Sequence, residues 1–190
     1  MLKTLIQKNR SYRRFYQDVP ITREQLREWV DLARLSASAA NRQPLKFALS
    51  AEPERNARIF ACLGWAAYLP EWGGPAEGER PAAYIVILKD RQISANADVD
   101  SGIAAQSILL GAVEAGFGGC ILATVDRKTL RTELALPEHL EILLVIALGQ
   151  PRETVVIEPV GEDGDIRYWR DAEGVHHVPK RALDALIFSA

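Results

Sequence analysis

Three arginines lie close together near the start of the 190-residue sequence, where Ser11 interrupts a cluster of Arg10, Arg13 and Arg14. A guanidinium group matches two phosphate oxygens with paired hydrogen bonds, so such clusters are common at phosphate sites. A solvated surface explains the same residues equally well. The spacing alone therefore allows both a phosphate site and a charged surface.

A second basic pair, Lys180 and Arg181, lies near the other end of the sequence, at the expected start of a short helix. The free N–H groups of a helix N-terminus bind anions, so the pair is either a phosphate clamp or ordinary surface charge. A phosphate held by both basic groups would bring the two ends of the chain together.

Polar side chains crowd into one stretch that a proline ends, because Ser36, Ser38, Asn41 and Gln43 all precede Pro44. Their hydroxyl and amide groups can both donate and accept hydrogen bonds. Capping and turn formation account for one or two of these residues but not easily for four. The mixture suits a site that reads the edge of a flat heterocyclic ring.

The remaining reactive residue types indicate no further site. Cys62 and Cys120 are too few for a disulfide framework and lack metal-ligand spacing, which predicts buried free thiols. His139, His176 and His177 lack the spacing of zinc ligands, and adjacent histidines on a strand point in opposite directions. We therefore expect no metal.

The composition predicts a single domain over residues 1–190. Hydrophobic residues make up 48% and charged residues 25%, and no apolar run approaches the ~20 residues of a membrane span. A net charge of −2 and a pI of about 6.0 argue against nucleic acid as a partner. The first residues lack the features of a signal peptide, so we expect a cytoplasmic protein.

The elements that position these groups follow from periodicity. Thr22 and Gln25 form a capping box before apolar residues at helical spacing, which predicts a helix over residues 22–34. Pro44 ends the polar loop that follows, and alternating apolar residues predict a strand over 45–49. The polar stretch therefore lies on a loop between a helix and a strand.

The middle of the chain predicts a helix, a loop and two central strands. Residues 57–69 are apolar enough for a helix, whereas residues 71–80 contain three glycines and a proline and predict an irregular loop, a candidate lid. The runs 82–88 and 142–148 are continuously apolar, as expected of strands covered on both faces.

A helix predicted over residues 101–115 is apolar on almost every side, so it must be buried on most of them. Such burial in a small domain predicts that this helix lies in the core of a homodimer. The glycines in 116–119 end this helix. Residues 120–125 then predict a short strand, and Asp126 is expected to cap a helix that runs to Leu134.

The C-terminal part predicts a hairpin and a last helix. Segments 168–170 and 175–178 flank a turn at 171–174 whose last residue is glycine. A short helix then carries Leu183, Leu186 and Ile187.

Taken in order, these segments resemble the nitroreductase family. The resemblance rests on five stretches that match in order and spacing: residues 9–15, 37–44, 101–120, 148–151 and 178–181. It implies an α+β fold with a mixed sheet flanked by helices, and a homodimer with two FMN sites at the subunit interface. It also implies a C-terminal arm from about residue 151.

The resemblance further implies which residues hold FMN. It assigns the phosphate and ribityl chain to a basic set: Arg10, Ser11, Arg13 or Arg14, Lys180 and Arg181, with the backbone of Tyr12. It assigns the isoalloxazine edge and the ribityl chain to the polar loop: Ala37, Ser38, Asn41 and Gln43. It places four residues against the ring near N5: Ile121, Leu122, Ala123 and Thr124.

Three positions depart from the family pattern. Ala37 stands where the family often has proline, Leu45 where it often has an aromatic residue, and Ala123 near a frequent glycine. These differences affect the expected pocket shape and substrate preference more than FMN binding.

The implied activity is that of an FMN-dependent oxidoreductase. NADH or NADPH gives hydride to flavin N5 and leaves, and a small acceptor such as a nitroarene or quinone then takes the electrons, in a ping-pong mechanism. No side-chain acid or base is required, because the protein positions the reactants and stabilises negative charge near N1 and O2. Arg42 or Lys46 would supply positive charge there.

Other functions share some of these features. Reductive dehalogenation or flavin fragmentation on the same fold would differ from nitroreduction in the 71–80 loop and the arm. A flavin-binding sensor or store would not oxidise NAD(P)H rapidly. A structural dimer whose basic ends are only surface would be colourless when purified.

Overall fold

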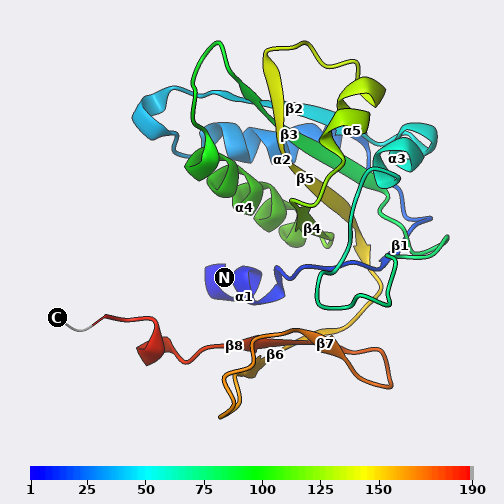
Figure 1. The fold of residues 1–190 in the computed structure, drawn as a ribbon, viewed down its shortest axis with the longest axis vertical. Helices are drawn as coiled ribbons and strands as arrows, with labels where there is room; N and C mark the ends of the chain where they lie inside the picture. Colours follow the sequence, from blue (N-terminus) through cyan, green and yellow to red (C-terminus); the bar gives the residue numbers. More distant parts are fainter. Residues whose placement is uncertain (189–190) are drawn as a thin grey trace.

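The computed structural model describes residues 1–188, and a five-stranded sheet forms its centre (Figure 1). The helices and helical turns are α1 Leu2–Lys8, α2 Arg23–Leu35, η1 Ala39–Asn41, α3 Pro53–Phe60, α4 Asp98–Glu114, α5 Arg127–Glu133 and η2 Leu183–Ala185. The strands are β1 Phe15–Tyr16, β2 Leu45–Ser50, β3 Ala83–Asp90, β4 Gly118–Leu122, β5 Leu140–Pro151, β6 Val155–Pro159, β7 Trp169–Arg170 and β8 His176–Lys180. These helices and sheets confirm the predicted α+β fold.

The long strand β5 organises the main sheet. It pairs with β1, β3 and β4, and β3 pairs in turn with β2, each time antiparallel. Every residue of β3 is buried, and the register places Ile85 opposite Ile146. Both apolar runs predicted as central strands are therefore confirmed. A parallel pairing joins β6 to β8 in a smaller three-stranded sheet.

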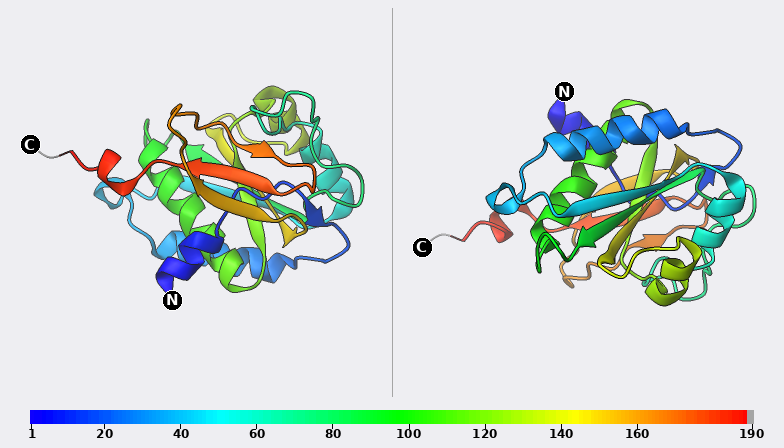
Figure 2. Two further views of the ribbon diagram at one scale, coloured as in Figure 1. Left: turned by 90° about the horizontal axis from the view of Figure 1, so that it is seen from below. Right: turned by 90° about the horizontal axis from the view of Figure 1, so that it is seen from above.

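Helices cover both faces of the main sheet (Figure 2). Successive side chains of β3 point to opposite faces, so they pack against different helices. Ile85 packs with residues of α2 and α4, whereas Tyr84 packs with residues of α3 and α5. Cys62 and Cys120 lie in the second of these apolar layers as free, buried thiols, as predicted. Burial raises the pKa of both thiols.

Two predicted helix starts are confirmed by their capping bonds. Thr22 Oγ1 accepts a hydrogen bond from Gln25 N at 3.2 Å, and Gln25 Oε1 accepts one from Thr22 N at 2.8 Å. Asp126 caps α5 by accepting from Thr129 N at 3.1 Å. These signals are contained within four residues, so the sequence alone is sufficient to read them.

The helix predicted over residues 57–69 is wrong in its boundaries, because α3 covers Pro53–Phe60 and turns follow it. Proline occupies the start of α3, where a helix needs no N–H donor. Beyond α3 the backbone makes tertiary contacts, and Gly64 N donates to Thr124 O at 2.9 Å. Apolar periodicity cannot detect backbone bonds between residues so far apart.

The boundaries of α4 and β4 also differ from the prediction. Helix α4 begins three residues earlier than expected, at Asp98, and Gly116 follows it with a φ of 83°. Strand β4 covers Gly118–Leu122 and not residues 120–125. Only one of the glycines after α4 therefore has the left-handed backbone of a helix terminus.

Within residues 1–188, no helix has the length and apolar character needed to cross a membrane.

The predicted C-terminal hairpin is confirmed, because β7 pairs antiparallel with β8 and Gly174 closes the turn with a φ of 80°. The last predicted helix is wrong, since only the single turn η2 Leu183–Ala185 forms there. Lys180 is the final residue of β8, so the basic pair does not lie at a helix N-terminus. The small sheet lies beside α1, and η2 projects from it (Figure 1).

Gly119 brings the N-terminal segment against β4. Ser11 forms a parallel bridge with Gly119, and Tyr12 N donates to Gly119 O at 3.0 Å. A Cβ atom on Gly119 would lie 2.5 Å from Ala147 O and 2.8 Å from a methyl carbon of Leu109. The first contact is with backbone, so it cannot be relieved by rotating a side chain.

We predict that Gly119→Ala lowers the free energy of unfolding by about 1–3 kcal/mol, the usual cost of overpacking. Chemical denaturation measures this change. Gly73→Ala is the matched control, because a Cβ atom there meets no atom within 4 Å and the glycine is exposed. Equal stability of Gly119→Ala and the control would contradict the close approach.

Candidate functional site

Both basic clusters line one cavity of about 710 Å³. The N-terminal segment contributes Arg10, Ser11 and Arg13, and the C-terminal arm contributes His176, Lys180 and Arg181. The structure therefore brings the two ends of the sequence together around one space.

The N-terminal wall of this cavity is fixed by bonds to its neighbours. Tyr12 donates from its backbone to Gly119 O and from its hydroxyl to Lys8 O, both at 3.0 Å. Arg10 Nη2 donates to Ile6 O at 2.7 Å. Tyr12 does not line the cavity, and its contacts support the backbone between Arg10 and Arg13.

Arg13 carries a buried positive charge into the cavity wall, since the residue is only 8% exposed. Its guanidinium carbon lies 4.6 Å from the centre of the Tyr168 ring, and Nη1 lies 3.3 Å from Ser11 O. The ion pairs found within residues 1–188 include no carboxylate bound to Arg13. Its Nε atom, like that of Arg10, is buried and has no hydrogen-bond partner in the described part of the chain.

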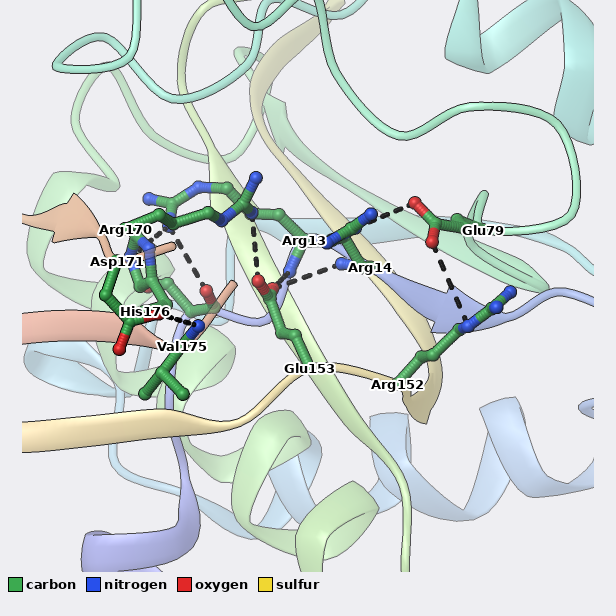
Figure 3. A network of polar contacts seen from close by, with 10 residues as sticks. Arg13, Arg14, Glu79, Arg152, Glu153, Arg170, Asp171, Val175 and His176 are labelled. Carbon is green, nitrogen blue, oxygen red and sulfur yellow. Dashed lines mark hydrogen bonds and ion pairs between the residues drawn. The ribbon is translucent and has the colours of Figure 1, made fainter. Parts of the chain in front are cut away.

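Arg14 points away from the basic cavity, toward Glu79. Its Nε atom pairs with Glu79 at 2.7 Å, and Arg152 approaches the other oxygen of that carboxylate at 3.8 Å (Figure 3). Arg14 does not line the basic cavity. Of the two arginines that the sequence left open, the structure brings only Arg13 to the cavity.

Glu153 joins the N-terminal wall to the C-terminal arm, and its side chain is only 1% exposed. The carboxylate accepts from the backbone N–H of Arg13 and, at 3.1 Å, from that of Arg14. It also pairs with Arg170 at 2.9 Å (Figure 3). Sequence reasoning missed Glu153, because one acidic residue after a strand has no local signature.

The polar loop is held by a second buried carboxylate, that of Asp100 in α4, which is 4% exposed. Ser38 Oγ donates to Asp100 Oδ2 at 2.7 Å, and Ala39 N donates to Asp100 Oδ1 at 2.9 Å. Gln43 N donates to Ser38 Oγ at 2.9 Å. Asp100 was also missed, because it belongs to a helix whose start lies far from the loop in sequence.

The polar loop has an unusual backbone. Ala40, Asn41 and Gln43 have φ angles of 49°, 52° and 52°, in the left-handed region that costs energy for residues other than glycine. A cavity of about 250 Å³ lies beside the loop, lined in part by Ala37, Gln43 and Lys46. It shares no lining residue with the basic cavity. The two predicted halves of the site are thus separate within one chain.

The segment 121–124 lines neither of these two cavities. Ile121 is 40% exposed, Leu122 is buried, and Thr124 O accepts the hydrogen bond from Gly64. The assignment of this segment to the flavin face stays a prediction.

The candidate lid, residues 71–80, is attached at both of its ends. The Arg170 guanidinium lies 4.2 Å from the centre of the Trp72 ring. Glu79 pairs with Arg14, and its carbonyl oxygen accepts from Phe15 N at 3.0 Å. The loop lines no part of the basic cavity, so its role as a lid stays a prediction.

The basic cavity suits a ligand with a phosphate group. Four cationic side chains, Arg10, Arg13, Lys180 and Arg181, surround one space. Buried charge without a counter-ion is costly, and a bound oxyanion would supply both the missing charge and the missing acceptors. An α+β domain with such a cavity is a candidate binder of a phosphorylated cofactor.

The chain belongs to the nitroreductase family, whose model matches residues 6–150. One relative is a protein of Archaeoglobus fulgidus that is named as an NADH dehydrogenase or NAD(P)H nitroreductase. It is 29% identical to this chain over 148 residues, which are 74% of this chain and 80% of that protein. The NADPH-flavin oxidoreductase of Vibrio harveyi is 27% identical over 168 residues. These residues are 80% of this chain and 66% of that longer protein.

Solved structures show the same fold. An FMN-dependent nitroreductase of Clostridium difficile has a TM-score of 0.64 and 24% identity, over 78% of this chain and 87% of that chain. A structure from Parabacteroides distasonis, named for NADH dehydrogenase and NAD(P)H nitroreductase, has a TM-score of 0.66 and 25% identity, over 80% and 88%. The shared fold agrees with the family model.

We predict that Glu153→Ala lowers the free energy of unfolding by about 3–5 kcal/mol, because it leaves the Arg170 charge buried without its partner. Denaturation measures the loss, and hydrogen exchange should show faster opening of residues 155–180. Glu162→Gln is a control on the same arm, because Glu162 is exposed. Unchanged exchange in Glu153→Ala would show that other contacts hold the arm.

Proposed function

We propose that this protein is an FMN-dependent oxidoreductase that passes electrons from NADH or NADPH to a small acceptor such as a nitroaromatic compound or a quinone. The observation that carries the proposal is the cavity in which basic residues from both ends of the chain surround one space. Membership of the nitroreductase family and the flavin-dependent relatives support it.

Each half of the proposed site has its own task. Arg10, Ser11, Arg13, Lys180 and Arg181 would bind the phosphate, because their donors line one cavity. The strained loop with Ser38, Asn41 and Gln43 would bind the ring edge in a geometry that Asp100 fixes in advance.

FMN would supply the redox chemistry, accepting hydride from the nicotinamide and passing electrons onward. The chain's own residues bind and orient the cofactor, and none is needed as an acid or base. We further propose a ping-pong order, in which the donor leaves before the acceptor enters. Arg42 or Lys46 is the candidate for positive charge near the pyrimidine edge, and Lys46 lines the cavity beside the polar loop.

The absorption spectrum of the purified protein tests the cofactor, and steady-state oxidation of NADH or NADPH with an added quinone or nitroarene tests the activity. A yellow protein whose released chromophore is FMN, and which turns over, is the expected result. FMN without turnover would favour a binding protein. A colourless protein that does not bind added FMN would contradict the proposal.

We predict that Arg10→Ala and Arg181→Ala each weaken FMN binding about ten- to a hundredfold, or roughly 1.5–3 kcal/mol, because each removes a hydrogen bond to a charged group. The double variant should lose less than the sum, since both residues hold one phosphate. Fluorescence titration measures the affinity. Riboflavin lacks the phosphate, so its affinity should be nearly unchanged by either substitution.

Arg27→Ala controls for the loss of charge, because Arg27 lies on α2 with 67% of its side chain exposed. It should leave both flavin affinities unchanged. If Arg10→Ala and Arg181→Ala weaken riboflavin as much as FMN, these arginines act on the fold and not on the phosphate.

We also propose a homodimer, in which the polar loop of one copy completes the basic cavity of the other. Four large apolar side chains after β8 are exposed: Leu183 70%, Leu186 68%, Ile187 57% and Phe188 91%. Exposed apolar surface of this kind marks an interaction site. Light scattering should give twice the 21.1 kDa mass at micromolar concentration, and the monomer mass would contradict the proposal.

A further inference from the structure

His176 lines the basic cavity on the arm side. It contacts Arg13, a buried arginine of the N-terminal wall (Figure 3). Its residue is 1% exposed, and its Nε2 atom lies 3.1 Å from Arg13 Nη1. The Tyr168 ring packs against both residues, 5.2 Å from the imidazole centre and 4.6 Å from the guanidinium carbon. Arg13 therefore contacts two aromatic rings, those of His176 and Tyr168.

The chemistry of the two groups fixes the direction of this hydrogen bond. A guanidinium has only donors, so the imidazole must accept at Nε2 and therefore carries its proton at Nδ1. A doubly protonated imidazole has no acceptor and would place two cations in contact. The contact thus requires neutral His176.

The surroundings of His176 favour that neutral state. Arg13 faces it from the N-terminal segment and Arg170 from β7, and Glu153 is already paired with Arg170. Burial, these two cations and the neighbouring His177 lower the pKa of His176 to about 4. The buried Nδ1 of the imidazole has no hydrogen-bond partner among residues 1–188, so no carboxylate of this part of the chain stabilises a second proton.

The neighbouring His177 faces the other side of β8 and has the opposite environment. Its ring stacks on Trp169 at 4.1 Å, and its two nitrogens lie 3.0 Å from Glu158 and 3.1 Å from Asp171. These carboxylates raise the pKa of His177. One strand thus carries two histidines whose protonation differs because of what each side chain faces.

We propose that His176 is a positioning residue, which as a neutral imidazole accepts a hydrogen bond from Arg13 and holds this guanidinium in place to bind the phosphate of the ligand. The inference rests on the proposed function, because it takes FMN as the ligand of the basic cavity. An acidic partner would also hold Arg13, but it would neutralise the charge that the phosphate needs. A neutral acceptor fixes the side chain and leaves its charge available.

Two substitutions separate positioning from packing. His176→Gln keeps an acceptor oxygen within reach of Arg13 but does not titrate, whereas His176→Leu fills similar space without an acceptor. We expect His176→Leu to weaken FMN binding about tenfold, the loss for a hydrogen bond to a charged group, and His176→Gln to recover most of it. Riboflavin should bind with equal affinity to the two His176 variants. His177→Gln, on the opposite face of β8, should leave the affinities for FMN and riboflavin unchanged.

NMR of the ring nitrogens tests the hydrogen bond directly, without relying on activity. In wild-type protein at pH 7, His176 should carry its proton on Nδ1 and stay neutral down to a pH near 4. His177 provides the reference in the same spectra, since it should become protonated at a higher pH than an ordinary histidine.

The outcomes distinguish the two proposals. If wild-type protein fails to bind FMN, both the proposed function and the positioning role are overturned. If FMN binds but His176→Leu leaves its affinity unchanged, or weakens riboflavin equally, only the positioning role is overturned. A proton on Nε2 of His176 at pH 7 overturns the positioning role as well.

Discussion

The buried carboxylate of Glu153 is the contact on which the site depends. It follows the central strand β5 by two residues and binds the backbone of the N-terminal segment at Arg13 and Arg14. The same group pairs with Arg170 on the arm. Because the oxygens of a buried carboxylate must accept hydrogen bonds or pair with a cation, these three segments are held in one arrangement. That arrangement places the two basic ends of the chain on opposite sides of one cavity.

A second constraint comes from close backbone approach. The N-terminal segment reaches the cavity only by passing against β4, where Gly119 has no room for a side chain. Gly119 does not have a left-handed backbone, so glycine is needed at this position because a side chain would not fit, and not because of the backbone conformation. Packing against Ala147 of β5 thus sets the path of a segment whose function lies in its arginines.

The polar loop is also held by a buried carboxylate, that of Asp100. Asp100 holds Ser38 and the following backbone, and the loop keeps three residues in the left-handed region. Such strain persists only where surrounding contacts determine the backbone, and it is common where a ligand must meet a rigid surface. Buried carboxylates therefore support both halves of the proposed site while remaining outside the groups that would contact FMN.

The sequence by itself determined the capped helix α2, the central strands β3 and β5, the C-terminal hairpin and the basic clusters. Each of these depends on periodicity, capping or composition over a few neighbouring residues, so local order is sufficient to read it. The α+β fold followed from the resemblance to the nitroreductase family. Resemblance in five ordered stretches identified the family, which the match over residues 6–150 confirms.

Only the tertiary structure decided which basic residues share a cavity and what holds them there. Arg13 and Arg14 are adjacent and chemically alike, yet one lines the cavity and the other pairs with Glu79. His176 and His177 differ in the same way, since one contacts Arg13 and the other lies between two carboxylates. The physical reason is that the partner a side chain faces decides whether an arginine charge is already paired and whether a histidine is protonated, and those partners come from segments remote in sequence.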